Sequence, residues 1–192
     1  PKTEKAAELL EEIFERESRS LGLKVLGWRD IKTDNSVLGE TSIGTEPQMR
    51  QVFVENTREI HYLDFDRELF ILRKLVEQDA ATYEDLLDIM YICSLSSQTV
   101  TYKGQLTPEQ VMRYYTDLQE PHFTRHMALV HSRFSTNTCP SWERAQPIRM
   151  MCHNGEINTL RGNKNWMYSR GSLINSPIFP DGGTESLLTS TS

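Results

Sequence analysis

The chain has 192 residues, of which 38% are hydrophobic and 25% charged. This composition is typical of a soluble globular domain and excludes disordered, collagen-like and miniprotein classes. No apolar run approaches the roughly 20 residues that a membrane helix needs, and no basic-then-apolar leader opens the sequence, so we expect no membrane association. Three cysteines, an odd number, favour free thiols in a reducing compartment over a disulfide framework.

The net charge of −6 is unevenly distributed along the chain. Residues 1–96 hold 12 Lys and Arg against 20 Asp and Glu, whereas residues 97–192 hold 9 against 7. The cationic groups of the second half are mostly arginines set among small polar residues, not a run of Lys and Arg. This pattern argues against nucleic acid as a partner.

Hydrophobic periodicity predicts five elements and one loop in the first half of the chain. Amphipathic spacing predicts a helix over 3–19 that Gly22 ends, and a second helix over 66–78. Short apolar runs predict strands over 23–31 and 49–54, which a turn-rich loop over 34–47 separates. The β-branched, hydroxyl-rich stretch 89–102 predicts a strand or hairpin.

The second half of the chain contains the clearest helix start, because Thr107 can cap, Pro108 suits the first turn and Gln110 completes a capping box. Apolar runs predict core strands over 127–134 and 148–153, and a final helix is expected to begin near Asn158. Residues 181–192 form no readable element. Residues 1–192 are therefore expected to form one mixed α and β domain with a sheet core.

Two predicted strand ends carry unusual polar residues: HSRFSTNT over 131–138 and CHNGEINT over 152–159. The Asn154-Gly155 pair is a tight-turn signal and has a purely structural interpretation. Alternatively, the Asn154 amide and the Gly155 backbone N–H form a pair of donors that holds an oxyanion. The spacing alone leaves both interpretations open.

Arg133 and the Cys and His residues of these segments also allow two interpretations each. Arg133 can form a surface salt bridge, or it can bind a carboxylate with two parallel hydrogen bonds. Metal binding is disfavoured because no CxxC occurs and adjacent Cys152 and His153 on a strand point to opposite faces. Packing of small hydrophobic side chains explains Cys93 and Cys152 better.

Together, the motifs HSRFSTNT, PSW, AQP and HNGEINTLRGNKNWM, in this order and spacing, resemble the glutaminase domain of the glutamate synthase large subunit. This domain is a class II glutamine amidotransferase with the N-terminal-nucleophile hydrolase fold, a four-layer αββα sandwich. The resemblance is clearest over 21–171. It implies an α+β fold that is incomplete at its N-terminal end, with residues 1–192 forming a partial domain.

The resemblance also implies roles for individual residues. Arg133 is similar to the arginine that binds the α-carboxylate of glutamine, and Phe134 and Thr136 lie where the family lines the substrate pocket. Asn154 and Gly155 match the oxyanion-hole pair. These assignments agree with the chemistry expected of a carboxylate clamp beside a pair of oxyanion donors.

Several positions depart from the family pattern. Thr184-Glu185-Ser186 stands where the family has Ser-Asp-Ser, whose aspartate helps to bind the α-amino group of glutamine; Glu185 is one methylene longer. Gln146 replaces a common His, and Cys139 and Cys152 replace Phe and Ala. The family's nucleophile is an N-terminal cysteine whose own α-amine is the base, and neither Cys139 nor Cys152 matches it. We therefore expect these 192 residues alone to hydrolyse no glutamine.

In the whole family enzyme, ammonia released from L-glutamine passes to a further domain, where 2-oxoglutarate is reductively aminated. The resemblance implies FMN and an iron–sulfur cluster in that enzyme, and no cofactor or metal in this segment. Its implied partners are the remaining domains of the large subunit and a small electron-transfer subunit or ferredoxin. A cytoplasmic location is expected, or the plastid if the source is eukaryotic. A non-catalytic module that binds glutamine or a related amino acid is the alternative.

Overall fold

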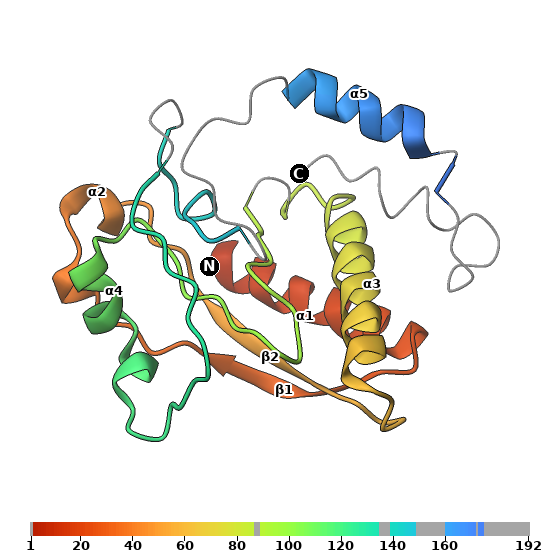
Figure 1. Ribbon diagram of the computed structural model, residues 1–192, viewed down its shortest axis with the longest axis horizontal. Coiled ribbons are helices and arrows are strands. Elements are labelled where there is room, and N and C mark those ends of the chain that lie inside the picture. The colour runs from red at the N-terminus through yellow and green to blue at the C-terminus, as the bar shows by residue number, and fades with distance from the viewer. Residues whose placement is uncertain (1, 87–88, 135–138, 149–159, 172, 175–192) are drawn as a thin grey trace. The chain divides into compact units, whose positions relative to one another are not determined.

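The computed structural model describes residues 2–86, 89–134, 139–148, 160–171 and 173–174 (Figure 1). The chain divides into two compact units. Unit 1 comprises Pro1–Lys24, Asn56–Gln98 and Ile157–Ser192, and unit 2 comprises Val25–Glu55 and Thr99–Glu156. Each unit has its own interior.

Unit 1 is built on two long helices that pack against each other, α1 (Lys2–Ser20) and α3 (Tyr62–Ala80) (Figure 1). Their contact is apolar, and each fully buried aliphatic or Phe side chain contributes roughly 1.5–3 kcal/mol. The buried side chains are Ala6, Ile13, Phe14, Phe65, Leu69, Leu72, Val76 and Ala80. An ion pair between Arg16 and Asp79 also joins the two helices. A third helix, α5 (Leu160–Gly171), belongs to the same unit.

The end of α1 confirms the stop predicted at Gly22. The Leu23 N–H donates to the Ser18 carbonyl at 2.8 Å and the Gly22 N–H donates to the Arg19 carbonyl at 3.0 Å. These two bonds form a Schellman motif, which needs a left-handed residue at Gly22. Gly22 has φ of +69°, a conformation that glycine adopts without steric cost.

Unit 2 contains a two-stranded sheet and several short helices. Strands β1 (Lys24–Asp30) and β2 (Arg50–Glu55) pair, which confirms both strands predicted in this region. The connection between them, predicted as a loop, includes η1 (Asn35–Val37) and α2 (Glu40–Ile43). Downstream lie α4 (Pro108–Tyr114) and η2 (Thr116–Gln119).

The start of α4 has the capping box that the sequence predicts. The Gln110 N–H donates to Thr107 Oγ1, and the Thr107 N–H donates to Gln110 Oε1 at 2.8 Å. The last residue of this helix, Tyr114, belongs to the interior of unit 2, a cluster formed by Leu38, Tyr114, Tyr115 and Trp142. Its aromatic rings meet edge-to-face or tilted, an arrangement that the ring quadrupoles favour.

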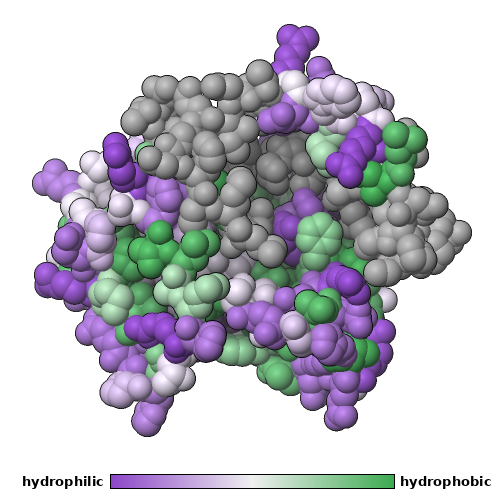
Figure 2. Space-filling model, viewed as in Figure 1, coloured by the Kyte–Doolittle hydropathy of each residue, from purple (hydrophilic) through white to green (hydrophobic). Residues whose placement is uncertain are grey.

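Two expected strands are wrong where the structure describes them. Residues 89–102 form no regular strand in the described part of the chain; instead, Asp66 accepts hydrogen bonds from Ser96 and Ser97. Residues 127–134 are neither a strand nor core, since Met127 is 83% and Val130 79% exposed. Apolar side chains also reach the surface on the face shown in Figure 2. A strand requires a hydrogen-bonding partner, and β-propensity alone does not supply one.

The mixed α and β class is confirmed, whereas the expected sheet core is wrong for the described residues: the sheet has two strands, and the interiors are helical in unit 1 and aromatic in unit 2. The final helix is confirmed, and its predicted start near Asn158 lies outside the described residues, as do 149–153 and 181–192. In the part of the chain that the structure describes, no helix is long and apolar enough to cross a membrane.

Candidate functional site

Arg133 lies in an irregular segment and projects to the surface. Its backbone N–H donates to His131 Nδ1 at 3.2 Å, which fixes the backbone orientation at this point. Arg133 is exposed, and the next residue, Phe134, is half-buried. Within the described ranges, the Arg133 guanidinium makes no ion pair, so these residues leave its donors available to a carboxylate.

The other predicted site residues are Thr136, Asn154, Gly155 and Glu185, and all four lie outside the described residues. The carboxylate clamp, the oxyanion pair and the α-amino contact remain predictions.

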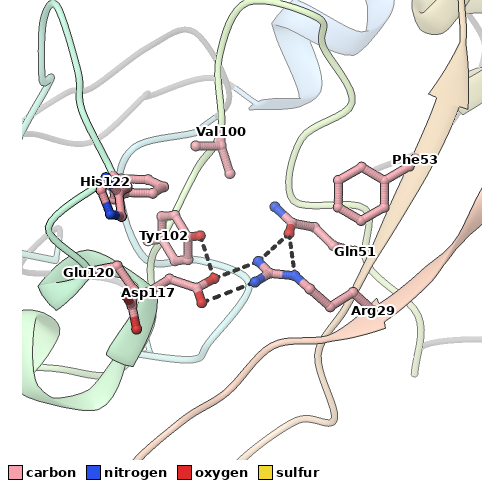
Figure 3. Close-up of a pocket in the computed structure, with 9 residues that line it drawn as sticks. Arg29, Gln51, Phe53, Val100, Tyr102, Asp117, Glu120 and His122 are labelled. Atoms are coloured by element: carbon pink, nitrogen blue, oxygen red, sulfur yellow. Dashed lines mark hydrogen bonds and ion pairs between the residues drawn. The ribbon is translucent and has the colours of Figure 1, made fainter.

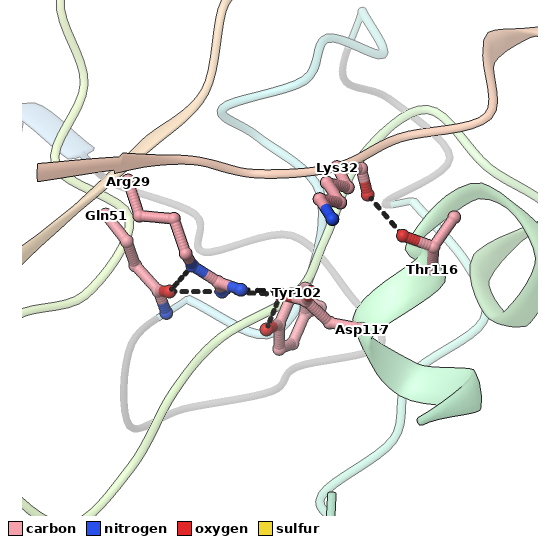
Figure 4. Close-up of polar contacts among 6 residues, drawn as sticks. All are labelled: Arg29, Lys32, Gln51, Tyr102, Thr116 and Asp117. Atoms are coloured by element: carbon pink, nitrogen blue, oxygen red, sulfur yellow. Dashed lines mark hydrogen bonds and ion pairs between the residues drawn. The ribbon is translucent and has the colours of Figure 1, made fainter. Parts of the chain in front are cut away.

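A second polar cluster in unit 2 joins distant parts of the sequence around Arg29, as Figure 4 shows. Arg29 projects from β1 and donates to both carboxylate oxygens of Asp117 in η2, at 3.1 and 2.5 Å. It also donates through Nε and Nη2 to Gln51 Oε1 on β2, at 3.2 and 2.5 Å. Tyr102 completes the cluster by donating its hydroxyl to Asp117 Oδ2 at 2.9 Å.

The charges of this cluster stabilise each other. Hydrogen bonds from Arg29 lower the pKa of Asp117, with a further contribution from the Tyr102 hydroxyl, and together they outweigh the opposing effect of burial. Burial, followed by the hydrogen bond to Asp117, raises the pKa of Tyr102. The Arg29 guanidinium and the Asp117 carboxylate therefore form a neutral pair at physiological pH.

A pocket of about 390 Å³ lies beside this cluster (Figure 3). It is lined by Arg29, Gln51, Phe53, Val100, Tyr102, Asp117, Glu120, His122 and Phe123. Because Asp117 already occupies the guanidinium of Arg29 on two nitrogens, that arginine has no net charge to offer an anionic substrate. We interpret the cluster as a structural clasp between the sheet and η2.

The sequence analysis missed this clasp, and no local signal could have found it. Arg29 lies in an ordinary strand pattern, and Asp117 follows a helix where an exposed acidic residue is common. Their pairing spans 88 positions of sequence. Only the tertiary structure of unit 2 brings the two groups together.

The cysteines are consistent with free thiols where the structure describes them. Cys93 is half-buried and Cys139 exposed, and neither forms a disulfide; Cys152 lies outside the described residues. The prediction that Cys93 is core is therefore only partly met. Among the residues with described positions, no three His, Cys, Asp or Glu side chains gather closely enough to hold a metal ion.

Comparison with known proteins identifies the family. The family model of class-II glutamine amidotransferases matches residues 1–189. The chain belongs to this family. It is 49% identical over 176 residues to glutamate synthase [NADH] of Saccharomyces cerevisiae, a match that covers 89% of this chain and 8% of the relative.

Relatives from bacteria and plants are similarly close. Identity is 49% over 159 residues with the glutamate synthase [NADPH] large chain of Bacillus subtilis, covering 82% of this chain and 10% of the relative. Identity is 46% over 158 residues with the chloroplastic ferredoxin-dependent glutamate synthase of Spinacia oleracea, a match that also covers 82% of this chain and 10% of the relative. The chain thus spans about a tenth of the length of these curated relatives.

Proposed function

We propose that this chain is the glutaminase portion of a glutamate synthase, which hydrolyses L-glutamine to glutamate and ammonia. The observation that carries the proposal is the close similarity to glutamate synthases along more than four-fifths of the chain. The Arg133 guanidinium, which makes no ion pair with any residue of described position, supports it, because amide hydrolysis of an amino acid needs a group that binds the α-carboxylate.

The proposed chemistry is acyl transfer. The family's cysteine thiol attacks the carboxamide carbon of glutamine, the C–N bond breaks, ammonia leaves, and water releases glutamate from the thioester. Arg133 holds the α-carboxylate with Phe134 and Thr136 beside it. Asn154 and Gly155 donate to the oxyanion as it develops, and such donors typically contribute roughly a hundredfold to a thousandfold in rate each.

Glu185 is proposed to bind the α-amino group of the substrate through its carboxylate. The fold proposed for the complete domain is the four-layer αββα sandwich, in which β1 and β2 are two of the strands. The family membership supports both proposals.

We further propose that the ammonia is used to aminate 2-oxoglutarate in other domains of the same protein, where FMN and an iron–sulfur cluster supply the redox chemistry. An electron-transfer subunit or ferredoxin is the proposed donor. A cytoplasmic or plastid location is proposed on the same basis. The names of the relatives support this assignment, since they specify NADH, NADPH and ferredoxin.

Substitution of Arg133 in the whole protein tests the proposal. A charged hydrogen-bonded contact contributes about 1.5–3 kcal/mol, so Arg133→Ala should raise KM for glutamine about 10- to 100-fold. Arg133→Lys keeps the positive charge but loses the two parallel hydrogen-bond donors of the guanidinium, so its KM should lie between those of wild type and Arg133→Ala. Arg113→Ala, which removes another exposed arginine of unit 2, is the matched control. An unchanged KM in Arg133→Ala would refute the clamp, and a wild-type protein that binds glutamine without hydrolysing it would instead be a binding module.

A further inference from the structure

The segment 139–148, which we name the linking segment, lies in the sequence between the two halves of the proposed glutamine site. Arg133 precedes it and the Asn154-Gly155 pair follows it. Few residues separate it from either motif, and a chain reaches at most about 3.6 Å per residue. Contacts that fix the linking segment therefore restrict where Arg133 can lie.

The aromatic interior of unit 2 anchors the linking segment through Trp142. This side chain is 7% exposed, and its ring lies 5.5 Å from that of Tyr114. Gly104 forms the opposite wall, since a Cβ at that position would lie 2.4 Å from Trp142 Cζ3. The indole thus fills a space that depends on the absence of a side chain at Gly104.

Lys103 fixes the backbone of the linking segment beside this anchor. Only 6% of Lys103 is exposed, and its Nζ donates to the backbone carbonyl of Glu143 at 2.7 Å. Lys103 itself is held by Tyr115, whose hydroxyl donates to the Lys103 carbonyl at 2.6 Å. The chain of contacts runs from the core through Lys103 to the main chain next to Trp142.

A buried ammonium group is a poor means of gaining stability, because its desolvation opposes folding and well-packed apolar residues often do as well or better. Its advantage is direction: a charged donor holds one carbonyl in one place. We propose that Lys103 is a positioning residue for glutamine hydrolysis, which holds the linking segment and thereby the chain from which Arg133 offers its guanidinium to the α-carboxylate. The proposal rests on the proposed glutaminase function.

The test compares Lys103→Met and Lys103→Arg with wild type in the whole protein, measuring kcat and KM for glutamine separately. A group misplaced by about 1 Å can cost up to about a hundredfold in catalytic efficiency. Because Arg133 is proposed to bind the α-carboxylate of the substrate itself, its displacement should appear in KM, and we expect Lys103→Met to raise KM about tenfold. Lys103→Arg keeps a cationic donor and should recover most of this loss. Lys5→Met removes an exposed lysine of α1 and should leave both constants unchanged.

KM distinguishes positioning from stability. A purely structural role lowers the fraction of active protein, which reduces apparent kcat and leaves KM unchanged; that result would overturn the proposal. If Lys103→Met yields no folded protein, Gly104→Ala displaces Trp142 while retaining the charge and should also raise KM. A wild-type protein without glutaminase activity refutes the proposed function, whereas active wild type with an unchanged KM in the variants refutes only the role of Lys103.

Discussion

The contact between Gly104 and Trp142 yields the most quantitative prediction. A methyl group at Gly104 would lie 2.4 Å from Cζ3 and 2.5 Å from Cε3 of the indole, both far inside van der Waals contact. Trp142 is buried, so it cannot swing into solvent without losing its packing. Overpacking of this kind costs about 1–3 kcal/mol, and we expect Gly104→Ala to destabilise unit 2 by that amount.

Gly44→Ala is the matched control in the same unit. Gly44 has an ordinary helical conformation, and a Cβ there would meet only the Glu40 and Thr41 carbonyl oxygens at 3.5 and 3.8 Å. Such a substitution stabilises by about 0.4–1 kcal/mol through the unfolded state. Because the two substitutions change the free energy of unfolding in opposite directions, the difference between the two variants should exceed the difference of either one from wild type.

Native-state hydrogen exchange on the whole protein is the appropriate assay, because it reports opening free energies segment by segment and needs no two-state unfolding of a long chain. Exchange should accelerate in peptides that cover 103–116 and 139–148. Trp142→Phe removes the two clashing atoms, so the cost of Gly104→Ala should fall sharply in that background. Equal exchange rates in Gly104→Ala and Gly44→Ala would refute the reasoning. So would a Gly104→Ala substitution that destabilises the Trp142→Phe variant as much as it destabilises wild type.

Two further predictions concern the clasp and the cap. The lowered pKa of Asp117 means that its carboxylate stabilises the fold above the unfolded value of about 4, and that this contribution is lost as pH falls through the folded pKa. Asp117→Asn should thus lower the free energy of unfolding by about 1 kcal/mol at pH 7, a modest value because 42% of the Arg29 side chain is exposed to solvent. The difference from wild type should shrink in acid. A difference in hydrogen exchange that does not depend on pH would contradict this. Thr107→Ala should loosen α4 by about 1 kcal/mol, and Thr107→Ser should not; unchanged amide exchange over 108–114 in Thr107→Ala would show that the capping box is dispensable.

Elements with a local signal could be predicted from the sequence. Helix α4 begins where Thr107 and Gln110 satisfy each other's backbone N–H groups, and α1 ends where Gly22 adopts a left-handed conformation. Both signals lie within a few residues of the boundary that they specify. Helix α3 was predicted too short, because it begins at Tyr62 behind His61, whose side chain is an uncommon cap.

Elements that depend on partners could not be predicted in the same way. Stretch 127–134 has the composition of a core strand, yet Met127, Leu129 and Val130 are exposed in the described structure. Stretch 89–102 likewise has β-propensity without a regular ladder. An apolar run specifies that a surface should be buried, and its neighbour in three dimensions decides whether it becomes a strand.

The arginines show the same distinction at the level of the site. The excess of cationic groups in the second half of the chain drew attention to Arg133, but Arg29, in the acidic first half, has the more elaborate contacts. Those contacts are the reason that Arg29 is a poor candidate for binding substrate, since a guanidinium already paired with Asp117 gains little from a second carboxylate. Arg133 has no such partner within the described ranges, which leaves its charge uncompensated by these residues. An arginine is therefore better assigned by which acidic groups the fold brings to it than by the charge of the sequence around it.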